Sequence, residues 1–504
     1  MDLISGLLGG FHGVFQSANF FYCFVGVFIG TLVGVLPGIG PIGAMSILLP
    51  STFGLPPASS VIMLAGIYYG AMYGGSTTSI LVNIPGEAAS VITCLDGYQM
   101  ARKGRAGPAL GISAFGSFIG GTFSIIALMF LVFPLAETAL KFGPPELFAI
   151  ICLSMTVLTY LASRSVLKAM LMVVAGLLLG TVGLDPVSGS PRFAFGSASL
   201  LDGIGLVPVA MGLFGVSEVL LNIEQPQERD IFKTKIKDLF PSLQDWRRCL
   251  GPIGRGSLIG FLIGILPGGG AVMSTFLSYT TEKRLSRHPE EFGKGAIEGV
   301  AGPETANNAA AGGCFVPLLA LGIPPNPVMG LLLGALIIHG ITPGPLLLTQ
   351  HPEIFWGVIA SMYVGNVMLL LLNLPLIGIW VKVLKVPYRM LMPLILLCCL
   401  IGAYATSNNA VDVVIMIIFG IAGYVLRKLQ YELAPLILAM ILGPLAETNF
   451  RASLILSDGS LLIFLQKPIS AVILCISALL LLSTGLSAYR KTKTRMIEEA
   501  GADD

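Results

Sequence analysis

Charged residues are scarce in this sequence of 504 residues. Only 11% of the residues are charged, whereas 55% are hydrophobic. Soluble domains carry about 25% charged residues, so the composition argues against a soluble enzyme of ordinary domains. The 29 Lys and Arg nearly balance the 27 Asp and Glu. This small net charge gives no reason to expect a nucleic-acid partner.

Sequence motifs for catalysis and metal binding are also absent. The sequence contains no HExxH, GxSxG or Walker A pattern, which excludes the common zinc-protease, serine-hydrolase and P-loop sites. The histidines are dispersed, and the eight cysteines lack metal-ligand spacing. We therefore expect free thiols, no enzymatic activity and no cofactor except a coupling ion. The N-terminus has no basic region before its apolar segment, so we expect no cleaved signal peptide.

Long apolar runs dominate the sequence instead. A transmembrane helix needs about 20 apolar residues, and runs of this kind predict spans at 107–134, 145–162, 168–185, 201–222, 354–381, 389–405, 410–426, 432–450 and 468–489. Two further apolar regions, 58–100 and 296–338, are broken near the middle by Gly, Pro, Asn, Ser and Thr. Two more, 18–50 and 256–282, are divided by a Pro-Gly motif. Interruptions of this kind are typical of transporters with discontinuous helices.

Lys and Arg are confined to a few connections between these runs. The first of them is Arg102. Most of the Lys and Arg residues cluster at 102–105, 164–168, 229–255, 283–294, 382–389, 427–428 and 490–495. The positive-inside rule predicts that these clusters are cytoplasmic. Because cations flank 256–282 on both sides, that region is predicted to be a re-entrant hairpin. The same rule predicts a cytoplasmic C-terminus and a periplasmic N-terminus.

Two pairs of stretches indicate an internal repeat. GTLVGVLPGIGPIGAMS at 30–46 matches GFLIGILPGGGAVMSTF at 260–276, at an offset of 267 − 37 = 230 positions. NIPG at 83–86 matches GIPP at 322–325, at an offset of 323 − 84 = 239. In each pair, the loop after one stretch is basic and the loop after the other lacks Lys and Arg. PSTFGLPPASS is uncharged and its counterpart TEKRLSRHPEEFGK is basic, whereas MARKGRAGP is basic and its counterpart HGITPGPLLLTQHPE lacks Lys and Arg. This reversal predicts repeats of inverted topology.

We therefore predict an all-α polytopic membrane protein with two inverted-topology repeats, re-entrant hairpins and broken transmembrane helices. The first repeat covers 18–222 and the second 256–450, each with one hairpin, one broken helix and four further spans. A cytoplasmic connector covers 223–255. An extra C-terminal span follows at 468–489, and a cytoplasmic tail at 490–504.

The broken helices are the predicted binding region, because unwound membrane segments persist only where they line a cavity. The expected unwound stretches are 73–78 with 83–86, and 302–308 with 323–326. No Lys or Arg lies in either break, so an anion would be held by hydroxyls, amides, backbone N–H groups and helix dipoles. The substrate-binding candidates are Ser76, Thr77, Thr78, Asn83, Gly86, Thr305, Asn307, Asn308 and Asn326. The hairpin tips predicted to cap the site are Pro37, Gly38, Gly40, Pro267, Gly268, Gly269 and Gly270.

A coupling cation is expected beside the substrate. Candidate positions for Na⁺ lie near Gly38, Thr77, Gly268 and Asn308. Glu304 is the coupling candidate, because carboxylates at membrane depth are functional by default. Alternatively, Glu304 caps a helix directly after Pro303. Glu87 has the same two interpretations, with capping favoured.

Several of these residues also have a purely structural interpretation. The hydroxyls at 76–78 could bond to carbonyls of their own helix. Gly34 and Gly66 could simply allow close helix packing. Adjacent amides such as Asn307 and Asn308 point in different directions and both need partners, which favours a binding site there.

The same motifs give the chain a family resemblance. It resembles the TctA family, the large membrane subunit of tripartite tricarboxylate transporters, in GVLPGIGP (34–41), YGGSTTSILVNIPGE (73–87), LDGYQMARKGRAGPALGI (95–112), GILPGGGA (264–271) and GPETANNAAAGGCFVPLLALGIP (302–324). The resemblance implies a bacterial inner-membrane carrier with a small TctB-like membrane subunit and a periplasmic, TctC-like solute-binding protein. It also implies uptake of citrate or a related carboxylate with an ion gradient. Paired hairpins and unwound helices are further similar to those of elevator-type carriers.

We therefore predict a secondary active symporter that imports a carboxylate with Na⁺ or H⁺. The alternatives are a passive anion channel and a scaffold subunit of a membrane complex. An intramembrane enzyme is excluded, because neither a nucleophile with its base nor a metal-ligand set is present at membrane depth.

Overall fold

The computed structural model describes residues 3–36, 39–160, 165–185, 187–224, 239–268, 270–386 and 388–483. The chain is mostly helical (80%), which confirms the predicted secondary-structure class. Six helices among the described residues are long and apolar enough to cross a membrane: Ser17–Val35, Ala106–Ala139, Leu206–Glu224, Pro352–Asn373, Met390–Ser407 and Ala410–Lys428. The chain is therefore a multi-pass membrane protein.

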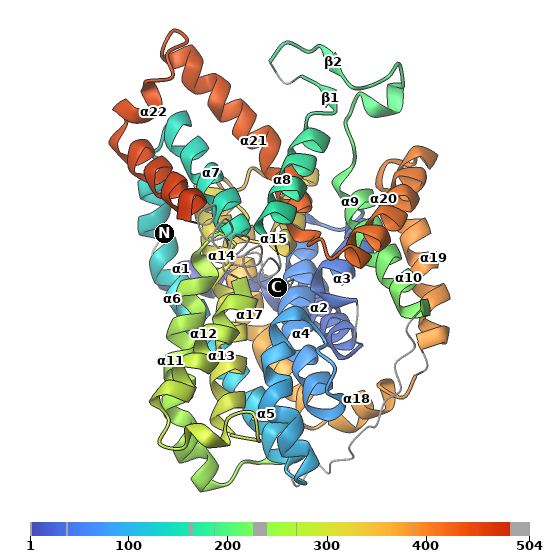
Figure 1. The fold of residues 1–504 in the computed structure, drawn as a ribbon, viewed down its shortest axis with the longest axis vertical. Helices are drawn as coiled ribbons and strands as arrows, with labels where there is room; N and C mark the ends of the chain where they lie inside the picture. The colour runs from blue at the N-terminus through green and yellow to red at the C-terminus, as the bar shows by residue number, and fades with distance from the viewer. Residues whose placement is uncertain are drawn as a thin grey trace, which may run out of the picture. The chain divides into compact units, whose positions relative to one another are not determined.

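The chain divides into two compact units (Figure 1). Unit 1 comprises Met1–Ala139 and Gly205–Tyr424. Its main helices are α1 (Leu3–Val14), α2 (Ser17–Val35), α3 (Gly40–Leu48), α4 (Pro57–Val82), α5 (Val91–Arg102), α6 (Ala106–Ala139), α9 (Leu206–Ala210), α10 (Ser217–Glu224), α11 (Leu243–Ile265), α12 (Gly270–Leu285), α13 (Glu298–Gly313), α14 (Phe315–Leu321), α15 (Pro327–Ile338), α16 (Leu347–Gln350), α17 (Pro352–Asn373), α18 (Ile377–Val383), α19 (Tyr388–Ser407) and most of α20 (Ala410–Lys428). A π-helical turn, Met211–Val216, joins α9 to α10.

Unit 2 comprises Leu140–Ile204 and Val425–Asp504. Its elements are α7 (Pro144–Tyr160), α8 (Val166–Gly180), β1 (Gly183–Leu184), β2 (Pro191–Arg192), α21 (Ala434–Leu456), α22 (Ile463–Gln466) and a last helix, Pro468–Ser483. The strands β1 and β2 form an antiparallel pair in the loop after α8. Helix α21 packs against α7 and α8.

Glycines bring two pairs of helices in unit 1 into backbone contact. On α2, a Cβ added to Gly30 would lie 2.5 Å from the carbonyl oxygen of Ile67 on α4. On α11, a Cβ added to Gly260 would lie 2.3 Å from the carbonyl oxygen of Ala306 on α13. Small residues permit such approaches between membrane helices, where packing drives association. These contacts hold α2 against α4 and α11 against α13. Helices α4 and α13 contain most of the predicted site.

The helices are less broken than predicted. Helix α4 runs without interruption through 73–78, and α13 runs through 302–308, so the prediction that these stretches are unwound is wrong. The predicted stretches 83–86 and 323–326 are non-helical, which confirms that part of the prediction. Each interruption begins with a residue in the left-handed region, Asn83 with φ of 58° and Gly322 with φ of 70°. The helices persist because polar side chains such as Ser76 find partners on neighbouring helices, so the backbone bonds need not open.

In each Pro-Gly region one helix ends shortly before the motif and another begins shortly after it. In the first, α2 and α3 flank the turn, and in the second, α11 and α12 do so. Gly40, Gly268 and Gly270 have positive φ angles of 62°, 78° and 51°, which explains the glycines at these turns. The predicted tip residues Pro37, Gly38 and Gly269 lie outside the described residues. That the hairpins re-enter the membrane remains a prediction.

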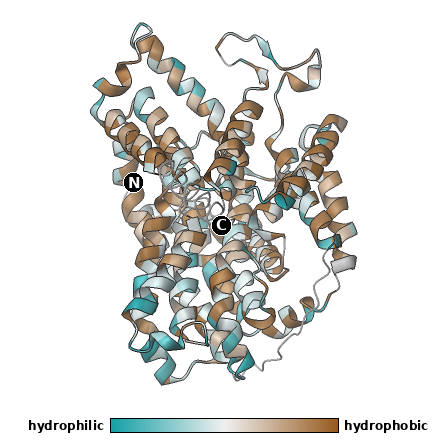
Figure 2. Ribbon diagram, in the orientation of Figure 1, coloured by the Kyte–Doolittle hydropathy of each residue, from teal (hydrophilic) through white to brown (hydrophobic). Residues whose placement is uncertain are grey.

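Hydrophilic residues gather at one end of α5, α11 and α12 in unit 1 (Figure 2). Ion pairs and hydrogen bonds connect these ends: Arg105 lies 2.5 Å from Asp245, and the Lys103 ammonium donates to the Lys294 carbonyl at 2.5 Å. The basic clusters at 102–105 and 283–294 therefore share one end of the unit. That this end is cytoplasmic remains a prediction.

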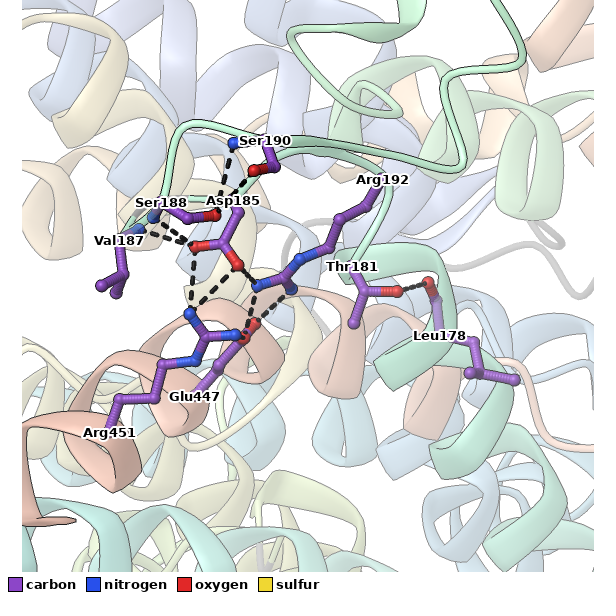
Figure 3. Close-up of polar contacts among 9 residues, drawn as sticks. All are labelled: Leu178, Thr181, Asp185, Val187, Ser188, Ser190, Arg192, Glu447 and Arg451. Atoms are coloured by element: carbon purple, nitrogen blue, oxygen red, sulfur yellow. Dashed lines mark hydrogen bonds and ion pairs between the residues drawn. The ribbon is translucent and has the colours of Figure 1, made fainter. Parts of the chain in front are cut away.

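In unit 2, two acids and two arginines close a ring of ion pairs beside the β1–β2 pair (Figure 3). Arg192 binds both Asp185 and Glu447, the latter at 2.8 Å, and Arg451 also binds both, at 3.0 and 2.7 Å. The Asp185 carboxylate further accepts the Val187 and Ser188 N–H groups. These contacts fix the loop after α8 to helix α21.

The loop is expected to lose stability in acid through Asp185. The Arg192 guanidinium, the Ser188 and Val187 N–H groups and Arg451 hold the pKa of Asp185 well below its usual range. A depressed pKa adds stability above the unfolded-state value of about 3.9, and this stability is lost as pH falls below it. Asp185→Asn should lower the thermal stability of the purified protein at neutral pH and show a smaller further loss in acid.

Asp202→Asn is the matched control for this change, because Asp202 lies in the same connection between α8 and α9 but is exposed. Its thermal unfolding should match that of the wild type at both pH values. An equal acid-induced loss in wild type and Asp185→Asn would contradict the assigned role of Asp185.

Candidate functional site

Two buried carboxylates lie at the centre of unit 1. Glu304, on α13, is 1% exposed, and Glu87, in the loop between α4 and the short 3₁₀ helix Ala88–Ser90, is 7% exposed. They are close enough to repel each other electrostatically. Asn307 lies one turn after Glu304 on the same helix face. These three side chains define what we call the carboxylate cluster.

Hydroxyl groups from several helices surround Glu304. Ser76 on α4 donates to one carboxylate oxygen, and Thr93 on α5 donates to the other. The Ser113 hydroxyl on α6 also faces Glu304. All of these hydroxyls are uncharged, so they solvate Glu304 without neutralising it.

The structure distinguishes the two interpretations of each glutamate. Glu304 lies almost two turns inside α13, which begins at Glu298, so the alternative that it caps a helix is wrong. Glu87 does cap the short helix Ala88–Ser90: its side chain accepts the Ala89 N–H at 2.5 Å. The second Glu87 oxygen accepts the Asn307 amide at 3.1 Å. Glu87 therefore has a partner beyond its cap.

The two adjacent asparagines point to different partners, as expected. Asn307 donates to Glu87, but its side-chain oxygen is buried and has no hydrogen-bond partner among the described residues. Asn308 donates to the Ser117 hydroxyl at 2.7 Å and to the Glu304 carbonyl at 3.2 Å. The carboxylate cluster thus contains an unused oxygen acceptor.

The other predicted residues of the first break are spread around this cluster. Thr77 is buried within α4. The Thr78 hydroxyl donates to the Val35 carbonyl at the end of α2, at 2.6 Å. Asn83 is exposed. Gly86 packs so tightly that an added Cβ would lie 2.1 Å from the Gly34 carbonyl oxygen.

The remaining residues of the second break make local hydrogen bonds and one bond to a hairpin tip. The Thr305 hydroxyl donates to the Ala301 carbonyl of its own helix at 2.7 Å. Asn326 caps α15 by accepting the Met329 N–H at 2.9 Å. The Gly268 N–H, at the second hairpin tip, donates to the Pro325 carbonyl at 2.8 Å. This tip therefore contacts the second break directly, whereas Pro267 and Gly270 are partly exposed beside it.

A second polar cluster was not predicted from the sequence. The Tyr73 hydroxyl on α4 donates to Asn366 on α17 at 2.8 Å, and the Asn366 amide donates to Phe118 and Thr122 on α6. Tyr73 and Asn366 line a cavity of about 20 Å³ that Asn308 also lines, large enough for one water. The feature of the sequence that could have indicated this cluster is the amide of Asn366 within an otherwise apolar run.

The chain matches a family model and two curated proteins. The model of the tripartite tricarboxylate transporter TctA family matches residues 20–438. An uncharacterised 52.8 kDa protein in the TAR-I ttuC' 3' region of Agrobacterium vitis is 51% identical over 499 residues, which cover 99% of each chain. A protein in the TAR-II ttuC' 3' region of the same organism is 51% identical over 240 residues, which cover 48% of this chain and 99% of the relative. No solved structure matches.

These matches confirm the resemblance over nearly the whole chain. The family consists of transporters, so the expectation that the chain is not an enzyme is also confirmed. Membership of a tripartite system implies further components, in general a TctB and a TctC partner. The chain belongs to the TctA family, as the large membrane subunit of a tripartite tricarboxylate transporter.

Proposed function

We propose that this subunit imports a tricarboxylate or related carboxylate, such as citrate, across the bacterial inner membrane by symport with Na⁺ or H⁺. The observation that supports this most strongly is the buried carboxylate cluster. Glu87 and Glu304 receive hydrogen bonds from neutral groups. The ion pairs that we find in the described part of the chain involve neither of them. Buried charge of this kind requires a compensating cation or proton.

Such a cluster couples a cation to an anion by electrostatics. An anionic substrate near Glu304 would be repelled while the carboxylates are charged and unoccupied. Binding of a cation removes this repulsion, so cation and anion bind with positive cooperativity. Transport of either species alone is then disfavoured, which is the requirement for symport.

We place the substrate between 76–86 and 304–326, capped by the two Pro-Gly turns. The contact from Gly268 to Pro325 supports this, because movement of the second tip would change the conformation of the second break. Ser76, Asn307 and Asn308 bond to the carboxylate cluster or next to it. A ligand that contacts these side chains would therefore sense whether the cation is bound.

Matched positions in unit 1 support an internal repeat. The backbone contacts of Gly30 with Ile67 and of Gly260 with Ala306 recur at the same two offsets, 260 − 30 = 230 and 306 − 67 = 239, as the paired motifs. The left-handed caps Asn83 and Gly322 also lie 239 positions apart. Each compact unit takes residues from both proposed repeats. Inverted orientation of the repeats and elevator-type movement are part of the proposal.

We further propose a periplasmic N-terminus and a cytoplasmic C-terminus, with substrate delivered by a TctC-like binding protein and with a TctB-like small subunit in the complex. The deciding experiment is uptake of labelled citrate and related acids into proteoliposomes, with the binding protein added and Na⁺ and pH gradients imposed separately. Symport predicts accumulation against a concentration gradient. A passive anion channel would only equilibrate the substrate, and a scaffold subunit would give no uptake of its own. No uptake of any carboxylate with either gradient would end the symporter proposal.

Thr77→Ala and Asn308→Ala should weaken substrate binding severalfold while leaving expression intact, because each removes one polar group, worth about 1 kcal/mol, next to the proposed site. Asn373→Ala is the control, since that buried amide on α17 bonds within its own helix, to the Leu369 carbonyl. The measurement is the substrate concentration for half-maximal uptake. Wild-type values in both variants would move the substrate site elsewhere.

A further inference from the structure

We propose that Glu87 and Glu304 form one site for two monovalent cations, Na⁺ or H⁺, so that each transport cycle moves two cations with the substrate. This inference rests on the proposed symport function and adds a stoichiometry and a second coupling residue to it. It starts from the Asn307 side chain, which bonds to Glu87 and lies one turn after Glu304 on α13.

The two glutamates act together because of their placement on different elements. Glu304 and Asn307 are three residues apart on α13, and the Asn307 amide donates to Glu87 in the loop after α4 at 3.1 Å. The same loop contains Gly86, which packs against Gly34 at the end of α2. Helix α13 thus holds one carboxylate and the partner of the other.

The charge at this site requires two positive partners. Groups that face the pair from α4, α5, α6 and α13 include no Lys, Arg or His; they are Ser76, Thr93, Ser113 and Asn307. The nearby titratable groups Tyr68 and Cys94 are neutral in their ordinary protonated forms. One monovalent cation would leave a buried net negative charge, whereas two leave the site neutral.

The Asn307 oxygen is a second, independent indication of a ligand. It is fully buried and has no hydrogen-bond partner in the part of the chain that the structure describes, although buried polar atoms are nearly always paired. It lies on the same amide that contacts Glu87. Together with carboxylate and hydroxyl oxygens it offers the hard donor set that an alkali cation prefers to nitrogen or sulfur.

The two carboxylates have different expected roles. Glu304 accepts hydroxyls from two helices, α4 and α5, and so connects segments far apart in the sequence. Glu87 lies beside the first break and caps a local turn. Loss of the Glu87 charge should remove one cation and leave the Glu304 site occupied.

The test is the ratio of cations to substrate, measured as the ion gradient that just stops citrate flux in proteoliposomes containing the complete transporter. Separate arms use a Na⁺ gradient at equal pH and a pH gradient at equal Na⁺. The proposal expects a ratio of two in the wild type, with two Na⁺, two H⁺ or one of each, and a ratio of one in Glu87→Gln. Glutamine keeps an oxygen that can accept the Ala89 N–H, so the cap is retained.

Glu146→Gln is the matched control, because Glu146 is also buried and bonds to a backbone N–H, that of Gly143, but lies in unit 2. Its ratio should remain two. A wild-type ratio of one, or a ratio of two in Glu87→Gln, would overturn the inference while leaving symport intact. Uptake that is independent of both the Na⁺ gradient and the pH gradient would instead contradict the proposed function. If Glu87→Gln does not fold, the wild-type ratio alone decides.

Discussion

Replacing Glu304 by glutamine is expected to lower carboxylate uptake by the reconstituted transporter about 100-fold, near the upper end of typical coupling between two ligands. Glutamine is close in size, and the Ser76 and Thr93 hydroxyls that donate to Glu304 can still donate to an amide oxygen. The variant therefore loses charge but little packing. Without this charge the Glu304 cation is not held, so the ion gradient can no longer drive uptake through that cation. Because the neutral amide does not repel the anion, the loss of uptake reflects lost driving force and not weaker substrate binding.

The expected signature is a weaker ion dependence as well as a lower rate. Residual uptake by Glu304→Gln should respond much less to a Na⁺ or pH gradient than wild-type uptake does, because only a cation at Glu87 remains, and the purified variant should elute from size exclusion like the wild type. Glu304→Asp, which keeps the charge but shortens the side chain, should retain part of the ion-dependent uptake. Gradient-driven uptake at the wild-type rate in Glu304→Gln would show that coupling occurs elsewhere.

The sequence predicted the helices better than it predicted where the helices are interrupted. Apolar runs of about 20 residues have one stable form in lipid, since backbone groups must bond within the segment. Polar residues inside such runs are ambiguous. At 73–78 and 302–308 they suggested unwinding, but α4 and α13 are continuous there. The interruptions begin at Asn83 and Gly322, where the backbone turns left-handed, and include the predicted stretches 83–86 and 323–326.

The partners of the site residues could not be predicted because they are distant in sequence. Ser76 and Glu304 are 228 positions apart, and Tyr73 and Asn366 are 293 positions apart. Sequence reasoning identified Glu304 and Asn307 as candidates from their rarity at membrane depth. It could not indicate that Thr93, which lies in the predicted broken helix 58–100 but outside its expected unwound stretches, completes the Glu304 site. Pairing of this kind depends on how α4, α5 and α13 pack.

The second large effect is expected when a glycine of α11 is replaced by alanine. Gly260→Ala should destabilise the protein by about 1–3 kcal/mol or prevent its accumulation, as overpacking does in tight interiors. The added methyl would lie 2.3 Å from the Ala306 carbonyl oxygen, and backbone on both sides leaves no flexible group to move. The displaced helix would be α13, which contains Glu304 and Asn307. Uptake should therefore fall in whatever protein still folds.

Gly254→Ala separates this packing effect from helix propensity. Gly254 lies on the same helix, six residues earlier, and an added Cβ there meets nothing within 4 Å. Because alanine favours a helix over glycine by up to about 1 kcal/mol, this control should unfold at the same temperature as the wild type or higher. Thermal unfolding of the two detergent-purified variants is the measurement. If Gly260→Ala is as stable as Gly254→Ala, α11 and α13 are not in backbone contact, and the matched contact of Gly30 with Ile67 no longer supports an internal repeat.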